Sequence, residues 1–78
     1  MNTYAVEFTD TFDGEANYCW ANRFKVEAEN MKQAITKAKK REFGTCPKHT
    51  IDFNDGMMAR IDINNACICA FIELVDEE

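Results

Sequence analysis

The sequence predicts an α+β fold, in which one antiparallel sheet of four to five strands carries one α-helix on one of its faces. Apolar and polar residues alternate in the segments before residue 28 and after residue 49, which is the pattern of half-buried strands. Helical spacing of apolar residues is found between residues 31 and 43 alone. A chain of 78 residues forms one domain, so we expect residues 1–78 to share a single thin core.

The first part of the chain is predicted to form a β-hairpin. Tyr4, Val6 and Phe8 alternate with polar residues, and Asp13-Gly14 is a pair that tight hairpin turns favour. Residues 17–28 alternate again. One face of this second strand is then expected to carry Tyr18, Trp20, Phe24, Val26 and Ala28, and the other Cys19, Ala21, Arg23, Lys25 and Glu27.

Local signals then predict a helix of about 20 Å, at 1.5 Å per residue. Asn30 is a favourable N-cap, and Gln33 three residues later completes a pattern similar to a capping box. Gly44 stands where a helix C-terminal cap is expected. Basic residues in the last turn, Lys39 among them, complement the helix dipole.

Three further strands are expected after the helix. Residues 49–53 form a short one with Ile51 and Phe53 on one face, and residues 57–63 and 66–75 form two longer ones. Turns at residues 54–56 and 64–65 separate them, and residues 76–78 form an acidic tail. The order is ββαβββ, or ββαββ if residues 49–53 are irregular. The predicted core comprises Tyr4, Val6, Phe8, Trp20, Phe24, Val26, Ile35, Ala38, Phe43, Ile61, Ile63, Ile68, Ala70, Ile72 and Leu74.

The sheet face away from the helix is the first candidate binding surface. In the last strand the even-numbered apolar residues are expected to face the helix, so Cys67, Cys69 and Phe71 face away. A contiguous apolar patch on a small protein suggests a protein-binding or dimerisation face, although a loop or tail covering it would explain it equally. The candidate partner-binding residues of this face are Cys19, Arg23, Lys25, Met58, Arg60, Cys67, Cys69 and Phe71.

The helix is the second candidate surface, because its charge differs from that of the rest of the chain. Residues 31–43 carry +4, whereas the whole chain carries −5 and the remainder therefore −9. Lys37, Lys40 and Arg41 are spaced to form one stripe, which is either a solvated helix face or a contact for a nucleic-acid backbone or an acidic partner surface. The acidic balance argues against direct binding of nucleic acid.

Metal binding and catalysis are disfavoured by the residues available. Cys46, His49, Cys67 and Cys69 could supply a Cys3His zinc site, but side chains at i and i+2 of a strand diverge too far for tetrahedral chelation. The chain has one histidine and no serine, so Cys46 with His49 is the one nucleophile–base pair to consider. We therefore expect no enzyme, no cofactor and no resident metal, with a small zinc-stabilised module as an alternative.

Two segments of the chain resemble small accessory proteins of bacteriophages and mobile elements, of the anti-CRISPR kind. These are "RFKVEAENMKQAITKAKKREF" and the following "CPKHTIDF", which share the order strand, cap, helix and strand with such proteins. The resemblance implies a stoichiometric inhibitor that binds a host protein or CRISPR ribonucleoprotein complex and blocks its access to nucleic acid. It assigns no functional residue.

These observations together predict a non-catalytic protein-binding module. A homodimer formed through the open sheet face is the alternative. No segment has the length and hydropathy of a membrane span, and the first residues lack the features of a signal peptide. We therefore expect a cytoplasmic protein, and the resemblance implies a bacterial host cell.

Overall fold

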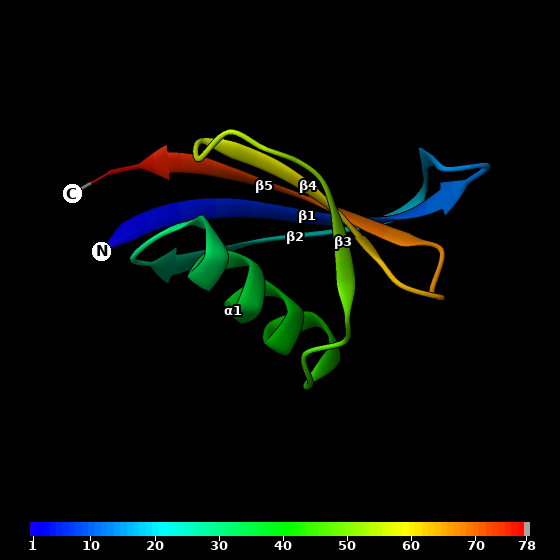
Figure 1. Ribbon diagram of the computed structural model, residues 1–78, viewed down its shortest axis with the longest axis horizontal. Helices are drawn as coiled ribbons and strands as arrows, with labels where there is room; N and C mark the ends of the chain where they lie inside the picture. The colour runs from blue at the N-terminus through cyan, green and yellow to red at the C-terminus, as the bar shows by residue number, and fades with distance from the viewer. Residues whose placement is uncertain (78) are drawn as a thin grey trace.

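The computed structural model describes residues 1–77, which form one helix and a five-stranded antiparallel sheet (Figure 1). The elements are β1 (Asn2–Phe12), β2 (Glu15–Ala28), α1 (Met31–Phe43), β3 (His49–Asn54), β4 (Met58–Ile63) and β5 (Ile68–Asp76). The strand order is β2-β1-β5-β4-β3, so the last strand lies at the centre, β1 lies beside it, and α1 connects the two edge strands. The α+β prediction is confirmed, with residues 49–54 forming a true fifth strand. Glu78, the end of the predicted tail, lies outside the described residues.

The core lies between α1 and one face of the sheet, which is called the inner face below. Phe8 on β1 is fully buried, and its ring stacks on Phe24 of β2 and meets the edge of Phe43 of α1. The buried apolar residues of this layer are Tyr4, Val6, Phe8, Ala28, Met31, Ala34, Ile35, Ala38, Ala59, Ile61, Ile63, Ala70 and Ile72. Burying this set is the main source of stability for so small a chain.

The helix begins and ends at the predicted residues. The Asn30 side chain accepts a hydrogen bond from the Gln33 amide at 2.9 Å, and the Gln33 side chain accepts one from the Glu29 amide at 3.0 Å. Gly44 has a φ of 75°, and its amide donates to the Lys40 carbonyl at 2.8 Å. These contacts satisfy backbone groups that helix ends otherwise leave unpaired.

The prediction that Trp20 belongs to the core is wrong, because 40% of this side chain is exposed. Asn22, two residues further along β2, hydrogen-bonds with Glu42 in the last turn of α1. Trp20 therefore lies beyond the last turn of the helix, which does not cover it. The predicted face of Tyr18 is also wrong: its φ of 57° breaks the alternation, and its side chain lies on the opposite side of the sheet.

Three predictions about the later strands also need correction. Ile51 pairs with Ile61, but a bulge follows and Phe53 pairs with Arg60, so Ile51 and Phe53 do not share a face. Met57, the first residue of the strand predicted over residues 57–63, precedes β4 and is 63% exposed. The last strand begins at Ile68 instead of residue 66.

The two edge strands of the sheet differ in how far other residues contact their free backbone groups. The Lys37 Nζ donates to the Glu27 carbonyl at 2.6 Å, and Arg41 donates to the Lys25 carbonyl at 3.3 Å. Both carbonyls belong to β2, so side chains of α1 occupy acceptors along this edge strand. The other edge strand, β3, is largely exposed, and no described residue pairs with its outer side. Along residues 1–77, no helix has both the length and the apolar character needed to cross a lipid bilayer.

Candidate functional site

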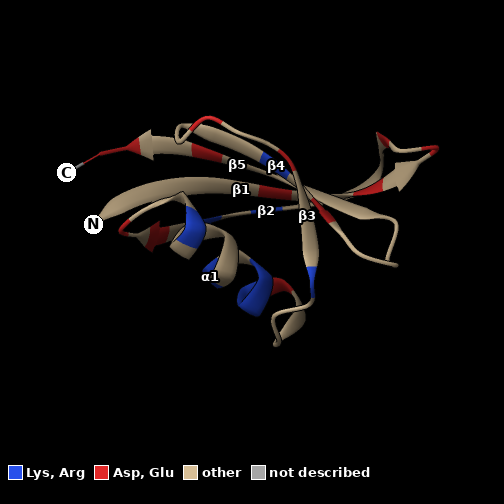
Figure 2. Ribbon diagram, viewed as in Figure 1, with Lys and Arg blue, Asp and Glu red and all other residues tan. Residues whose placement is uncertain are grey.

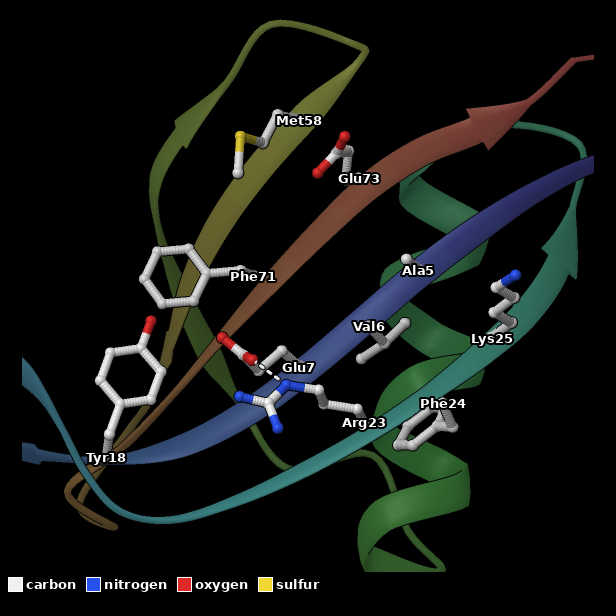
Figure 3. A pocket seen from close by; sticks show the side chains of 10 residues that line it. All are labelled: Ala5, Val6, Glu7, Tyr18, Arg23, Phe24, Lys25, Met58, Phe71 and Glu73. Atoms are coloured by element: carbon white, nitrogen blue, oxygen red, sulfur yellow. Dashed lines mark hydrogen bonds and ion pairs between the residues drawn. The ribbon is translucent and has the colours of Figure 1, made fainter.

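A hollow of about 600 Å³ lies on the sheet face opposite α1, which is called the outer face. It is the "outer hollow" of the following paragraphs (Figure 3). Its lining consists of Ala5, Val6, Glu7, Tyr18, Arg23, Phe24, Lys25, Met58, Phe71 and Glu73. These residues come from four of the five strands, and therefore the hollow exists only in the folded sheet.

The strand register explains how the lining is assembled. In antiparallel pairs, residues directly opposite one another place their side chains on the same face. Two rows cross the outer face in this way, namely Arg23–Glu7–Phe71–Arg60 and Lys25–Ala5–Glu73–Met58. The first row is paired internally, because Arg23 forms an ion pair with Glu7 and the Arg60 guanidinium lies 5.7 Å from the centre of the Phe71 ring.

The second row leaves its charges unpaired. Ala5 lies at its centre, with Lys25 on one side and Glu73 on the other. Neither the Lys25 ammonium nor the Glu73 carboxylate has a hydrogen bond or ion pair with residues 1–77. The small Ala5 side chain between two long charged ones leaves an apolar floor with opposite charges at its two sides.

Tyr18 joins the hollow through an irregular backbone. Its amide donates to the Thr9 hydroxyl at 3.1 Å, and that hydroxyl donates to the Trp20 carbonyl at 2.8 Å. These bonds hold Tyr18 in its left-handed conformation, and its ring points toward Phe71 (Figure 3). Burial, reinforced by the nearby Glu7 carboxylate, raises the pKa of the Tyr18 phenol, which therefore stays protonated at neutral pH.

The tip of the β1–β2 hairpin folds over the outer face. Residues 10–20, called the finger below, reach far enough for the Gly14 carbonyl to accept a hydrogen bond of 2.7 Å from Arg60 on β4. Since β5 lies between β1 and β4, the finger crosses β5 there, and Cys69 is fully buried. Burial raises the pKa of the Cys69 thiol, which keeps it neutral.

The sequence-predicted residues of the outer face therefore have different surroundings. Arg23, Lys25, Met58 and Phe71 line the outer hollow, and Arg60 lies beside it, tied to Gly14 and Asp62.

The three cysteines predicted on this face do not form an exposed patch. Cys69 is buried, as described above. Cys67 does not belong to the strand, because it lies in the turn before β5 with a φ of 51°. Cys19 is exposed on the finger, where its sulfur lies 2.8 Å from the side-chain nitrogen of Asn17. The prediction that Cys67 faces outward from the strand is therefore wrong.

The residues of the predicted basic stripe on the helix also differ in their surroundings. Lys37 and Arg41 hydrogen-bond to β2, and the Arg41 guanidinium lies 4.6 Å from the centre of the Phe24 ring. Lys40 is exposed. Two of the three stripe residues thus brace the edge strand, and all three lie on a different side of the sheet from the hollow.

The chemically reactive residues near the helix C-terminus contact different partners. The Cys46 sulfur lies 3.9 Å from the Thr36 carbonyl, whereas the His49 Nδ1 lies 2.8 Å from the buried Lys39 Nζ. Burial and the Lys39 charge lower the pKa of His49. Within residues 1–77, no three His, Cys, Asp or Glu side chains gather closely enough to hold a metal ion.

Sequence reasoning missed Ala5, Tyr18 and Glu73 as candidate site residues. The alternating pattern contained the signal for Ala5 and Glu73, since both share the outward side of their strands. Tyr18 carried no such signal, because its position depends on the Thr9 hydroxyl. No protein-family model matches the chain, and no match was found among the curated proteins or the solved structures compared with it.

Proposed function

We propose that this chain is a non-catalytic protein-binding module that holds a segment of a partner protein in the outer hollow. The observation that carries the proposal is the unpaired Lys25 and Glu73 on either side of Ala5. Unpaired opposite charges around an apolar floor are complementary to a protein segment that presents an apolar side chain between an acidic and a basic one.

The apolar rim of the hollow supports the same proposal. Met58 is 36% exposed and Tyr18 is 51% exposed, and both lie near the partly exposed Phe71. Aromatic and methionine side chains are enriched in protein–protein interfaces, where buried anchors carry much of the binding energy. Such a cluster on one face of a small protein is typical of a docking site.

The resemblance to anti-CRISPR proteins extends the proposal to a biological role. The partner is then a host protein or ribonucleoprotein complex of a bacterial cytoplasm, and the module inhibits it stoichiometrically by blocking its access to nucleic acid. The support for this role is the order of elements along the chain, which is an analogy between folds.

The test is affinity capture from a bacterial lysate with three forms of the protein as bait. We expect a specific partner to co-purify with the wild type and to be reduced at least tenfold with Phe71→Asp, because the carboxylate places a charge in the apolar contact. Val75→Asp is the matched control: it puts the same charge on an exposed residue of β5 that does not line the hollow. Circular dichroism and thermal melting check that all forms fold.

Two results would contradict the proposal. A partner retained by Phe71→Asp at the wild-type level places the binding surface elsewhere. A partner lost equally with Val75→Asp shows a general effect of added charge. If the purified wild type sediments as a dimer at low micromolar concentration and Phe71→Asp dissociates it, the hollow holds a second copy of the chain instead.

A further inference from the structure

The finger carries a concentration of exposed aromatic side chains. Phe12 is 75% exposed, and Tyr18 and Trp20 are 51% and 40% exposed. All three lie within nine residues of the β1–β2 hairpin, whose tip lies far from the helix (Figure 1). Large aromatic residues that stay exposed contribute less to stability than buried ones, whereas aromatic residues are common anchors of protein interfaces.

The finger is also acidic. Asp10, Asp13 and Glu15 lie on it, and the chain has no lysine or arginine before residue 23. The carboxylates of Asp13 and Glu15 have no hydrogen bond or ion pair with residues 1–77, and they colour the tip of the hairpin red in Figure 2. The finger thus presents unpaired negative charge next to exposed aromatic rings.

The conformation of the finger is well supported from within. Asp13 and Gly14 have φ values of 55° and 83°, as a tight hairpin turn requires. The Asp10 carboxylate accepts hydrogen bonds from the Asn17 side chain at 2.8 Å and the Cys19 amide at 2.9 Å. These bonds, that of Asn17 above all, lower the pKa of Asp10 and keep it ionised. A preorganised element loses little conformational entropy on binding.

We infer that the finger is a second docking element, which inserts the Phe12 and Trp20 side chains into a basic, apolar-pocketed surface on the partner protein. The inference rests on the proposed function and specifies the kind of partner. Its basis is charge complementarity, because the unpaired Asp13 and Glu15 attract lysine and arginine. The same charge repels nucleic-acid phosphates and anionic lipids, which leaves a basic protein surface as the matching partner.

Trp20 offers a direct test, since it is the one tryptophan of the chain and lies on the finger. The probes are two soluble 12-residue peptides, one of repeating Lys-Leu-Gly and one with Glu in place of each Lys. We expect the Lys peptide to shift Trp20 emission to shorter wavelengths, with a Kd that rises at least fivefold between 50 and 300 mM NaCl. The Glu peptide produces no shift.

Matched variants separate the finger from the general acidity of the protein. Asp13→Asn combined with Glu15→Gln weakens the binding of the Lys peptide at least fivefold, and Phe12→Ser weakens it similarly through the lost apolar contact. The control is Asp52→Asn combined with Asp76→Asn, which removes the same charge away from the finger and changes Kd less than twofold. Equal weakening by the control, or an emission unaffected by the Lys peptide, would overturn the inference.

The outer hollow and the finger can fail independently. Tyr18 belongs to both, but Phe71 does not belong to residues 10–20, and Asp13 and Glu15 do not line the hollow. In the lysate assay, a partner that is lost with Phe71→Asp but fully retained by the Asp13→Asn/Glu15→Gln form supports the outer hollow and refutes the finger. A partner lost in both cases supports the two elements acting together.

Discussion

The two faces of the sheet are ordered by different kinds of interaction. The inner face is apolar, and its residues pack between the strands and α1, with the Phe8 ring between Phe24 and Phe43. The outer face is held by polar contacts, among them the Thr9 hydroxyl and the bond from Arg60 to Gly14. Packing selects which residues are buried, whereas directed hydrogen bonds decide where an irregular segment such as the finger lies.

The largest loss of stability is expected from a substitution in the core of the inner face. Phe8→Ala removes a fully buried ring and should lower the free energy of unfolding by about 3–5 kcal/mol. Phe12→Ala on the same strand removes a ring that is 75% exposed, and it should change stability by less than about 0.5 kcal/mol. Urea unfolding followed by circular dichroism measures both. Similar losses in the two variants would show that the finger packs more tightly than its exposure indicates.

A smaller loss of stability is expected when a hydrogen bond of the outer face is removed. Thr9→Val keeps the shape of the side chain but removes the hydroxyl that bonds to Tyr18 and Trp20, which should cost about 1–3 kcal/mol. Thr9→Ser keeps the hydroxyl and should lose less than Thr9→Val. The urea midpoints of the two variants measure the difference, and we expect the higher midpoint for Thr9→Ser. A lower midpoint for Thr9→Ser than for Thr9→Val would mean that packing dominates on this face too.

The smallest effect concerns the edge of the inner face, where His49 contacts Lys39. The pKa of His49 is lowered, so between its usual value near 6.5 and its folded value the unfolded chain binds a proton that the folded chain does not. The contribution of neutral His49 to the free energy of unfolding is therefore full above about pH 7. It falls as the pH drops through this window. Melting temperatures between pH 7 and 5 should show the decrease in the wild type and a weaker one in His49→Gln. Identical profiles would assign the decrease to other groups.

Local signals in the sequence were sufficient for the elements. The helix was predicted from its own residues, because Asn30, Gln33 and Gly44 act through contacts within a few positions. The inner face of the central strands followed from strict alternation, and Tyr4, Val6 and Ile72 are buried as expected. These features depend on the short-range geometry of helices and strands, which the spacing of apolar residues reflects.

The irregular positions could not be predicted in the same way. The left-handed backbone of Tyr18 requires the Thr9 hydroxyl and Asp10 carboxylate on the neighbouring strand, and the change of face at Phe53 requires a bulge. Both are tertiary features that alternation does not encode. The exposure of Trp20 could have been predicted from lengths alone. A strand of 14 residues extends about 45 Å at 3.3 Å per residue, whereas the helix covers about 20 Å.

The bracing of β2 by Lys37 and Arg41 also limits how copies of this protein can assemble. Edge strands recruit one another when their backbone groups are free, and repeated recruitment at both edges produces fibrils. Here one edge is occupied by helix side chains, so pairing through β3 consumes the open edge of each copy and leaves β2 on both outer sides. We expect such an association to stop at two copies, because the occupied Glu27 and Lys25 carbonyls oppose the addition of a further strand at β2. Lys37 and Arg41 of the helix therefore oppose growth of the sheet beyond β2.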